Sequence, residues 1–217
     1  MLGIFGGSFD PIHFGHIKSA LSLLERFEFE QIRFIPCRLS PHKESVHADA
    51  RHRWQMLNLV CDSHPQLIAD DRELNRQPPS YTIDTLQELR KEHGEQQSLV
   101  LILGIDAYLG FCAWHRYEEI LSLCHIILMK RPGYSLDNKS AEKVKSSDCE
   151  CEYYDVNKTE EIRELKNSPY GKIYMSNLEE HDVSSTFIRK TISEGNPPKY
   201  LLPGNVWNYI RRNKLYK

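Results

Sequence analysis

Apolar and polar residues alternate along this chain in two different patterns. Short apolar runs predict buried strands at 2–5, 31–36, 66–69, 98–103, 125–130 and 172–175. Apolar residues at helical spacing predict helices at about 17–27, 50–61, 83–89, 185–193 and 203–212. Because strands and helices alternate, the sequence predicts an α/β fold, doubly wound around a mainly parallel sheet, with a small C-terminal helical part.

One stretch breaks this alternation. From Tyr134 to about Asp155 the residues are polar and charged without clean periodicity, so no regular structure is predicted there. With 217 residues the chain can bury one sizeable core. We therefore expect a single domain, 1–217, with helices from about 180 onward.

The composition limits which partners and locations are expected for this chain. Lys and Arg total 28 against 30 Asp and Glu, a formal net charge of -2, so no general attraction to nucleic acid or to a membrane surface is expected. The six cysteines lack C-x-x-C pairs, and we interpret all of them as reduced thiols, without zinc. Since no leader or membrane-spanning run is evident, a cytoplasmic location is expected, and a homo-oligomer stays open.

The segment after the first strand is chemically unusual. Gly6 and Gly7 let backbone approach a ligand, and a helix with exposed amides follows, an arrangement suited to anions. His13 and His16 are three residues apart and should point toward one region, where both can donate to phosphate oxygens. A zinc pair is the weaker alternative because the intervening Glu and a third ligand are missing.

Three further segments carry side chains that could bind a phosphate or a ribose. Ser184, Ser185 and Thr186 open a helix with hydroxyls, and Arg189 can share a helix face with Ser185. Lys43 follows a strand and a turn and can bring a point charge to a polyphosphate. Asp106 lies just beyond the most apolar strand, where it can accept from ribose hydroxyls or cap a helix.

Together these segments resemble the H-x-G-H nucleotidyltransferase superfamily, and more narrowly the bacterial nicotinate-nucleotide adenylyltransferases. The resemblance runs from residue 3 to about 210 through GGSFDPIHFGH, SYTIDTL, GIDAYLGFCAWHRYEEI, RPG, VSSTFIR and YLLPGNVWNYI. Two positions depart from the family pattern: His115 stands where Tyr is frequent, and a Cys-Arg-Leu-Ser stretch replaces an Asn-rich loop before Pro41.

The resemblance implies a Rossmann-like nucleotidyltransferase fold and transfer of AMP from ATP to nicotinate mononucleotide, with Mg²⁺ held mainly by the substrate phosphates. It implies catalytic roles for His13, His16, Lys43 and Arg189. The implied ATP site comprises Gly6, Gly7, Ser8, Phe9, His13, His16, Gly104, Asp106, Ser184, Ser185, Thr186 and Arg189. The implied pyridine nucleotide site comprises Lys43, Tyr81, Thr82, Trp114 and His115.

Two alternatives remain open on sequence grounds. An enzyme of this kind could prefer nicotinamide mononucleotide or accept both acceptors, because substrate choice is inferred only from the pyridine-side residues. A module that binds nucleotide without turnover is disfavoured, since binding alone has little need for His13, His16, Lys43 and Arg189 together.

Overall fold

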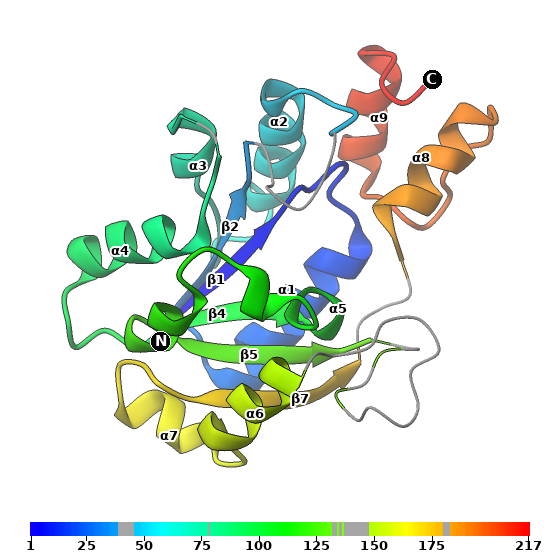
Figure 1. Cartoon of the computed structure of the whole chain (residues 1–217). Coiled ribbons are helices and arrows are strands. Elements are labelled where there is room, and N and C mark those ends of the chain that lie inside the picture. The colour runs from blue at the N-terminus through cyan, green and yellow to red at the C-terminus, as the bar shows by residue number, and fades with distance from the viewer. Residues whose placement is uncertain (39–45, 78, 132–133, 135, 137–147, 180–182) are drawn as a thin grey trace.

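The computed structural model describes residues 1–38, 46–77, 79–131, 134, 136, 148–179 and 183–217. Within these residues seven parallel strands form one sheet in the order β3-β2-β1-β4-β5-β7-β6 (Figure 1). The strands are β1 (Leu2–Gly7), β2 (Gln31–Pro36), β3 (Leu67–Ala69), β4 (Leu99–Gly104), β5 (His125–Lys130), β6 (Lys158–Thr159) and β7 (Ile173–Glu179). The predicted doubly wound α/β fold is confirmed.

The longer helices agree with the hydrophobic spacing. They are α1 (Phe14–Phe27), α2 (Ala50–Cys61), α4 (Thr82–His93), α8 (Ser185–Ser193) and α9 (Gly204–Arg212). Shorter helices are α3 (Arg72–Asn75), α5 (Ile105–Tyr108), α7 (Ile162–Asn167) and the 3-10 turns η1 (Phe111–Ala113) and η2 (Tyr117–Ser122). These short elements were not predicted, because one turn or two carries too little periodicity to be recognised.

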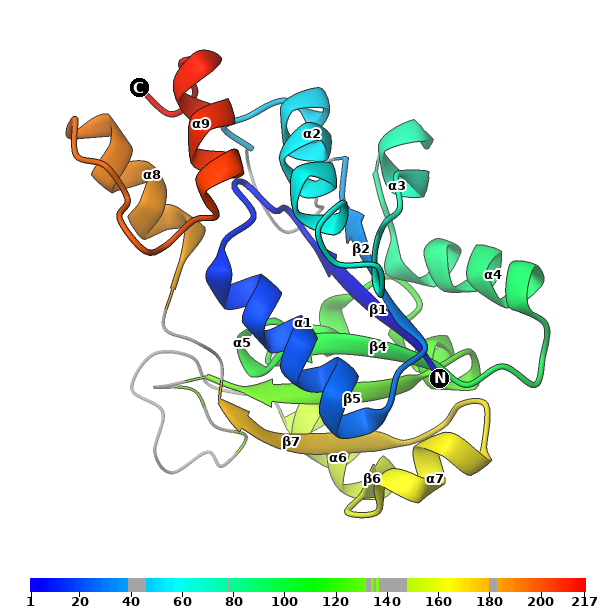
Figure 2. The same ribbon diagram turned by 180° about the vertical axis from the view of Figure 1, so that it is seen from behind.

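The two faces of the sheet bury separate cores, and the alternation of side chains along each strand explains why. Val100 and Ile102 of β4 pack with α1 and α2. Leu101 and Leu103 point to the other face and pack with α4. Helix α1 accordingly lies behind the sheet in Figure 1 and in front of it in Figure 2.

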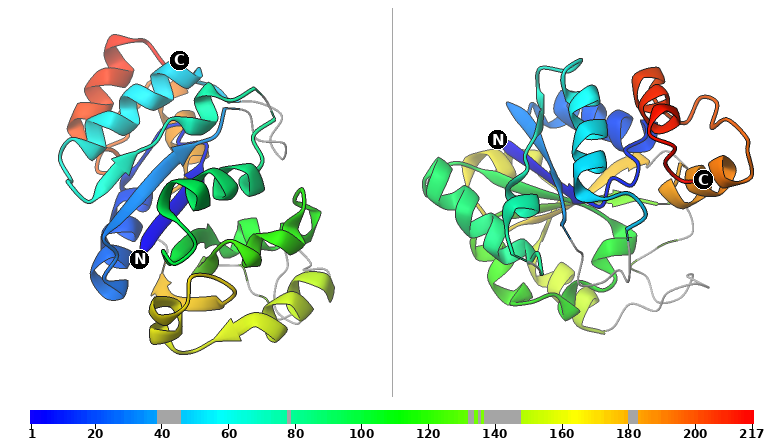
Figure 3. Two further views of the ribbon diagram at one scale, coloured as in Figure 1. Left: turned by 90° about the vertical axis from the view of Figure 1, so that its left-hand side faces the viewer. Right: turned by 90° about the horizontal axis from the view of Figure 1, so that it is seen from above.

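The last helix returns to the first half of the chain. Helix α9 lies beside α2 (Figure 3), and Asn205 donates to the carbonyl of Leu59 at 2.7 Å. Val206 and Ile210 of α9 are buried in the same core as α1. The region that follows α8 is therefore packed against the sheet unit and does not stand apart from it.

The chain adds its first strands on one side of β1 and its later strands on the other, so the sheet has a switch point between β1 and β4. From β1 the chain proceeds outward through β2 and β3, and it then returns to place β4 on the other side of β1. In such sheets ligands bind beyond the carboxyl ends of the strands at this switch point. The segments after Gly7 and Gly104 lie at this point, as the sequence predicted.

The stretch from 134 to 155 differs from the prediction where it is described. Helix α6 (Asp148–Asn157) occupies its end, so the expectation of irregular structure is wrong there. Tyr153 packs against Phe111, with ring centroids 5.6 Å apart. The few apolar residues of α6 are enough to hold it once η1 supplies a partner, and that partner is invisible in the local sequence.

The oxidation state of two cysteines also differs from the prediction. Cys112 of η1 and Cys149 of α6 form a disulfide, so the interpretation of all six as reduced thiols is wrong for this pair. The two residues are 37 positions apart, and only the packing of α6 on η1 brings them together. The other four cysteines remain thiols, at positions 37, 61, 124 and 151. Within the described part of the chain, every helix is too short or too polar to span a bilayer.

Alkylation tests the disulfide directly. Protein purified without reductant, denatured and treated with iodoacetamide should gain four adducts by intact mass, because four thiols lie outside the disulfide. Reduction before alkylation should raise the number to six, the total in the sequence. Six adducts without reduction would contradict the pairing of Cys112 with Cys149.

Candidate active site

The turn between β1 and α1, residues 6–13, forms the base of the site and is called the glycine turn here. Gly7 favours close packing, since a Cβ there would lie 3.0 Å from the Phe9 ring and the ring would have to shift by a few tenths of an ångström. Phe9 itself is buried, with a positive φ of 47°. Its side chain belongs to the core, so only its backbone is available to a ligand.

His13 and His16 lie face to face at the start of α1. His13 is the N-cap residue in an extended conformation, and the two imidazole rings stack with centroids 3.7 Å apart. Burial, and secondarily the charge of Arg131, lowers the pKa of His13 to about 3. His13 is therefore neutral near pH 7 and can donate one hydrogen bond while it accepts another.

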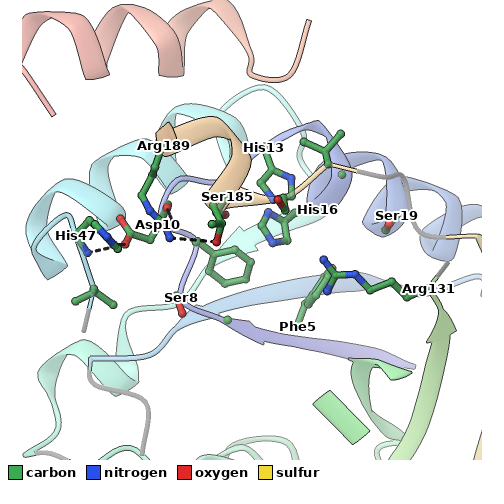
Figure 4. A pocket seen from close by; sticks show the side chains of 17 residues that line it. Phe5, Ser8, Asp10, His13, His16, Ser19, His47, Arg131, Ser185 and Arg189 are labelled. Atoms are coloured by element: carbon green, nitrogen blue, oxygen red, sulfur yellow. Dashed lines mark hydrogen bonds and ion pairs between the residues drawn. The ribbon is translucent and has the colours of Figure 1, made fainter. Parts of the chain in front are cut away.

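Helix α8 docks directly on the glycine turn (Figure 4). Ser184 caps the helix by accepting from the amide of Phe187, which leaves Ser185 and Arg189 free to face the turn. The hydroxyl of Ser185 donates to the carbonyl of Pro11 at 3.0 Å, and Nη1 of Arg189 donates to the carbonyl of Asp10 at 2.7 Å. The structure thus brings together the two segments that the sequence singled out for anion binding.

A cavity of about 390 Å³ opens between the glycine turn and α8, and we call it the first cavity. Its lining includes the predicted residues Gly7, Ser8, Phe9, His13, His16, Ser184, Ser185, Thr186 and Arg189. It also includes residues that sequence reasoning missed, namely Phe5, Asp10, Gly15, Ser19, Val46, His47, Arg131 and Val183.

Arg131 was within reach of sequence reasoning. It directly follows β5, and the carboxyl ends of parallel strands share one edge of the sheet. Figure 4 shows its guanidinium directed toward the two histidines. His47 and Val46 carried no such signal, because only the tertiary path of the chain brings them to the glycine turn.

A second cavity of about 500 Å³ lies on the other side of the glycine turn. Its lining includes Gly6, Gly7, Ser8, Tyr81, Thr82, Asp106, Trp114 and His115. Gly7 and Ser8 therefore line both cavities. Tyr81 and His115 form a tilted ring pair with centroids 4.3 Å apart, so the His at this departure from the family pattern still packs as an aromatic ring.

The floor of the second cavity also holds a buried carboxylate, on Glu73. Thr85 donates to its Oε1 at 2.7 Å, and Arg76 donates in turn to the Thr85 hydroxyl at 3.0 Å. Burial raises the pKa of Glu73, although the Thr85 hydrogen bond opposes this effect. Glu73 was missed because a four-residue helix gives no sequence signal.

An ion pair joins the two cavities. Asp106, which lines the second, forms a salt bridge with Arg131, which lines the first. Gly104 and not Asp106 is the N-cap residue of α5, so the capping alternative for Asp106 is wrong. Gly104 lines neither cavity in the part of the chain that the structure describes.

Lys43 lies outside the described residues. The described chain resumes at Val46, and Val46 and His47 both line the first cavity. As for metals, no group of three or more His, Cys, Asp or Glu side chains suited to a metal ion occurs among the described residues.

Removal of the Ser19 hydroxyl should stabilise the empty protein. Ser19 is 6% exposed, and its Oγ makes no hydrogen bond to any described residue. An unsatisfied buried hydroxyl costs free energy, so Ser19→Ala should raise the free energy of unfolding by about 1 kcal/mol in urea titrations. Ser98→Ala is the matched control and should lower it, because the buried Ser98 hydroxyl donates to Leu165 at 2.6 Å.

The neutral state of His13 should make the protein sensitive to acid. Its pKa of about 3 in the folded protein lies below the ordinary histidine pKa of 6.5, so between these pH values the unfolded chain binds a proton that the folded chain does not. Stability is then lost as pH falls below 6.5, by about 2 kcal/mol at pH 5. The loss in unfolding free energy between pH 7 and pH 5 should be smaller in His13→Asn, and equal losses would exclude this role for His13.

Comparison with known proteins agrees with this geometry. The cytidylyltransferase-like family model matches residues 4–191. A protein of Methylococcus capsulatus named "Probable nicotinate-nucleotide adenylyltransferase" is 40% identical over 217 residues, covering 100% of this chain and 99% of the relative. A protein of the same name from Klebsiella pneumoniae is 37% identical over 213 residues, covering 98% and 95%.

Solved structures share the fold. The Plasmodium falciparum nicotinic acid mononucleotide adenylyltransferase complexed with NaAD superposes with a TM-score of 0.74 at 20% identity, covering 99% of this chain and 96% of that one. A putative nicotinate-nucleotide adenylyltransferase from Vibrio parahaemolyticus gives 0.62 at 16% identity, covering 99% and 94%. From the family match and the full-length relatives, the chain belongs to the cytidylyltransferase-like family and, within it, to the nicotinate-nucleotide adenylyltransferases.

Proposed function

We propose that the protein transfers AMP from ATP to nicotinate mononucleotide, giving nicotinate adenine dinucleotide and pyrophosphate. The observation that carries this proposal is the meeting of two cavities at Gly7 and Ser8. One cavity is suited to a polyphosphate and the other to an aromatic ring. A transfer between two nucleotides needs their reacting phosphates side by side, and the shared wall is the place where they can meet.

The first cavity takes the triphosphate. Backbone amides of the glycine turn, with His13 and His16, are suited to hold the α- and β-phosphates. Ser185 and Arg189 already donate to carbonyl oxygens of that turn, so small movements would redirect them to phosphate oxygens. Lys43 is assigned to the outer phosphates as a positive charge. Gly104 and Asp106 are assigned to the adenosine side; Asp106 lines the second cavity and reaches the first through its ion pair with Arg131.

The second cavity takes the pyridine mononucleotide. Trp114 and the Tyr81–His115 pair offer aromatic faces to an electron-poor ring. Neutral donors near Tyr81 and Thr82 suit a carboxylate, and such donors disfavour an amide whose own NH₂ group would face them.

Glu73 supports a second candidate, adenylylation of nicotinamide mononucleotide. This buried acid lines the second cavity, where an ionised carboxylate would repel nicotinate and accept from an amide. Because burial raises its pKa, the acid is less readily ionised than an exposed one. Nicotinate is thus the preferred acceptor, and the amide is the alternative that the experiment below must separate.

The chemistry needs no protein nucleophile. A phosphate oxygen of the mononucleotide attacks the α-phosphorus of ATP, the bond from that phosphorus to the bridging oxygen of the β-phosphate breaks, and pyrophosphate leaves with the electron pair. The side chains hold two anions together and stabilise the charge that develops, which is the electrostatic part of catalysis. His16 is assigned to the α-phosphate.

Mg²⁺ fits this arrangement without a dedicated cage. Magnesium commonly keeps several waters and binds through substrate phosphates, and its charge would neutralise part of the triphosphate. Asp10 of the glycine turn lines the first cavity and Asp106 lines the second, and both carboxylates already accept from protein donors. We also propose that the chain acts as one nucleotidyltransferase domain, because residues of β1, α8 and α9 share one core.

Pyrophosphate release from ATP and Mg²⁺, with each mononucleotide supplied in parallel, tests the proposal. We expect kcat/KM for nicotinate mononucleotide to exceed that for the amide by about tenfold or more, because the amide leaves donors unpaired. His16→Ala should lower kcat by about 100-fold while the Kd for MgATP changes only a few-fold.

His64→Ala is the control for that substitution, since His64 lies after α2 and contacts Val60 rather than either cavity. Its kcat should match that of the unaltered protein. Preference for the amide would overturn the carboxylate assignment, and equal losses of turnover and ATP affinity in His16→Ala would favour a binding module without catalysis.

A further inference from the structure

The carboxylate of Asp10 lies where distant parts of the chain converge. The side chain is only 3% exposed, although it lines the first cavity. Its Oδ2 accepts from the amide of His47 at 2.7 Å, and its Oδ1 accepts from the amide of Ala48 at 3.1 Å. Asp10 therefore ties the glycine turn to the segment that precedes α2.

A third donor to this carboxylate comes from beyond α9. The hydroxyl of Tyr216 donates to Oδ1 of Asp10 at 2.8 Å, across 206 positions of sequence. On its other side, Asp10 offers its backbone carbonyl to Arg189 of α8. One residue of the glycine turn thus forms hydrogen bonds with three separate parts of the chain: residues 47–48, helix α8 and the segment after α9.

The backbone that delivers Tyr216 is strained. Lys214 and Tyr216 have φ values of 55° and 63°, in the left-handed region that bulky residues rarely adopt. Such conformations persist only where surrounding contacts favour them, and they gather at sites with a function. Here Leu215 and the body of Tyr216 pack against the core while the hydroxyl reaches Asp10.

Anchoring of α9 does not require this contact. Val206 and Ile210 bury the apolar face of the helix, and Asn205 donates to Leu59 of α2. Tyr209 adds a hydrogen bond to Nδ1 of His52 at 2.9 Å. Since the helix is held by α2 and the core, the effect of the Tyr216 hydroxyl should be local to Asp10.

Electrostatics gives the contact a role in ligand binding. A carboxylate in the wall of an anion site repels phosphate unless donors disperse its charge. Two amides and the Tyr216 hydroxyl do so at Asp10. Burial, reinforced by the neighbouring Asp10, raises the pKa of Tyr216 far above its ordinary value, so the hydroxyl keeps its proton and remains a donor.

We propose that Tyr216 is a positioning residue for the triphosphate site, because its hydrogen bond to Asp10 fixes the glycine turn and residues 46–48 in the arrangement that binds ATP. The inference rests on the proposed function only in naming ATP as the ligand. Tyr216 itself does not line the first cavity among the described residues, and it acts through Asp10.

Tyr216→Phe removes only the hydroxyl and is the test variant. Calorimetry with MgATP alone should show Kd raised about five- to tenfold, since the lost bond is to a charged group and acts one step from the ligand. In turnover, KM for ATP should rise by a similar factor, while kcat and the KM for the mononucleotide stay within about twofold.

Tyr209→Phe is the matched control. It removes one tyrosine hydroxyl hydrogen bond from the same region, but the partner is His52 on α2 and not the glycine turn. We expect a fall in Tm for both variants, larger for Tyr216→Phe because its partner is charged, with the Kd for MgATP unchanged within about twofold in Tyr209→Phe.

Several outcomes would overturn the proposal. One is an unchanged Kd for MgATP in Tyr216→Phe. Another is an equal rise of the Kd for MgATP in Tyr216→Phe and Tyr209→Phe. A third is a rise of the KM for the mononucleotide in Tyr216→Phe as large as the rise for ATP. If the unaltered protein binds MgATP but releases no pyrophosphate with either mononucleotide, the proposed function fails while the comparison of Kd values still decides the role of Tyr216. Absence of MgATP binding by the unaltered protein would refute both the proposed function and the proposed role of Tyr216.

Discussion

The hydrogen bonds from α8 to the glycine turn are the contacts on which the whole site depends. Ser185 and Arg189 donate to the carbonyl groups of Pro11 and Asp10, and these bonds close the first cavity on one side. The shared core already holds α8 near the turn, and these bonds align two groups of anion-binding residues that lie over 170 positions apart in the sequence. Affinity for a polyphosphate requires both groups at once, because either alone supplies only part of the charge and donors.

Buried donors hold the glycine turn from beneath as well. The fully buried guanidinium of Arg53 donates to the carbonyls of Ser8 and Cys37 at 2.8 and 2.7 Å. It thereby joins the residues that follow β1 and β2, and it also donates to Ala48 and Arg38. A buried charge is tolerated only when its hydrogen bonds are satisfied, so the turn and this arginine stabilise one another.

Several charged groups of the site already have partners before a ligand arrives. Arg131 is paired with Asp106, and Arg189 donates to a carbonyl of the turn. His13 is neutral, because burial and Arg131 lower its pKa to about 3. A bound triphosphate would compete for these donors, and its charge would favour protonation of His13. The site therefore combines preformed geometry with donors that can exchange partners, which suits electrostatic catalysis between two anions.

The sequence by itself determined most strands of the sheet and about half of the residues that line the first cavity; the two-residue strand β6 was missed. Hydrophobic runs and helical spacing located the main strands and long helices, because these patterns record which face of each element is buried. His13, His16 and Ser185 were found because they lie near the start of a helix, and Arg189 because it follows Ser185 by one helical turn; the catalytic roles of the two histidines and the arginine came from the family resemblance. The parallel order then placed Gly7 and Asp106 at one edge.

Only the tertiary structure decided the long-range contacts. The approach of His47 and Tyr216 to Asp10, the disulfide between Cys112 and Cys149, and the helix α6 that carries Cys149 have no local signature. Such contacts depend on how loops close after the cores have packed, and a hydroxyl or thiol has the same sequence context whether or not it finds a partner. Periodicity reports the burial of an element, whereas the identity of its partner is set by the three-dimensional path of the chain.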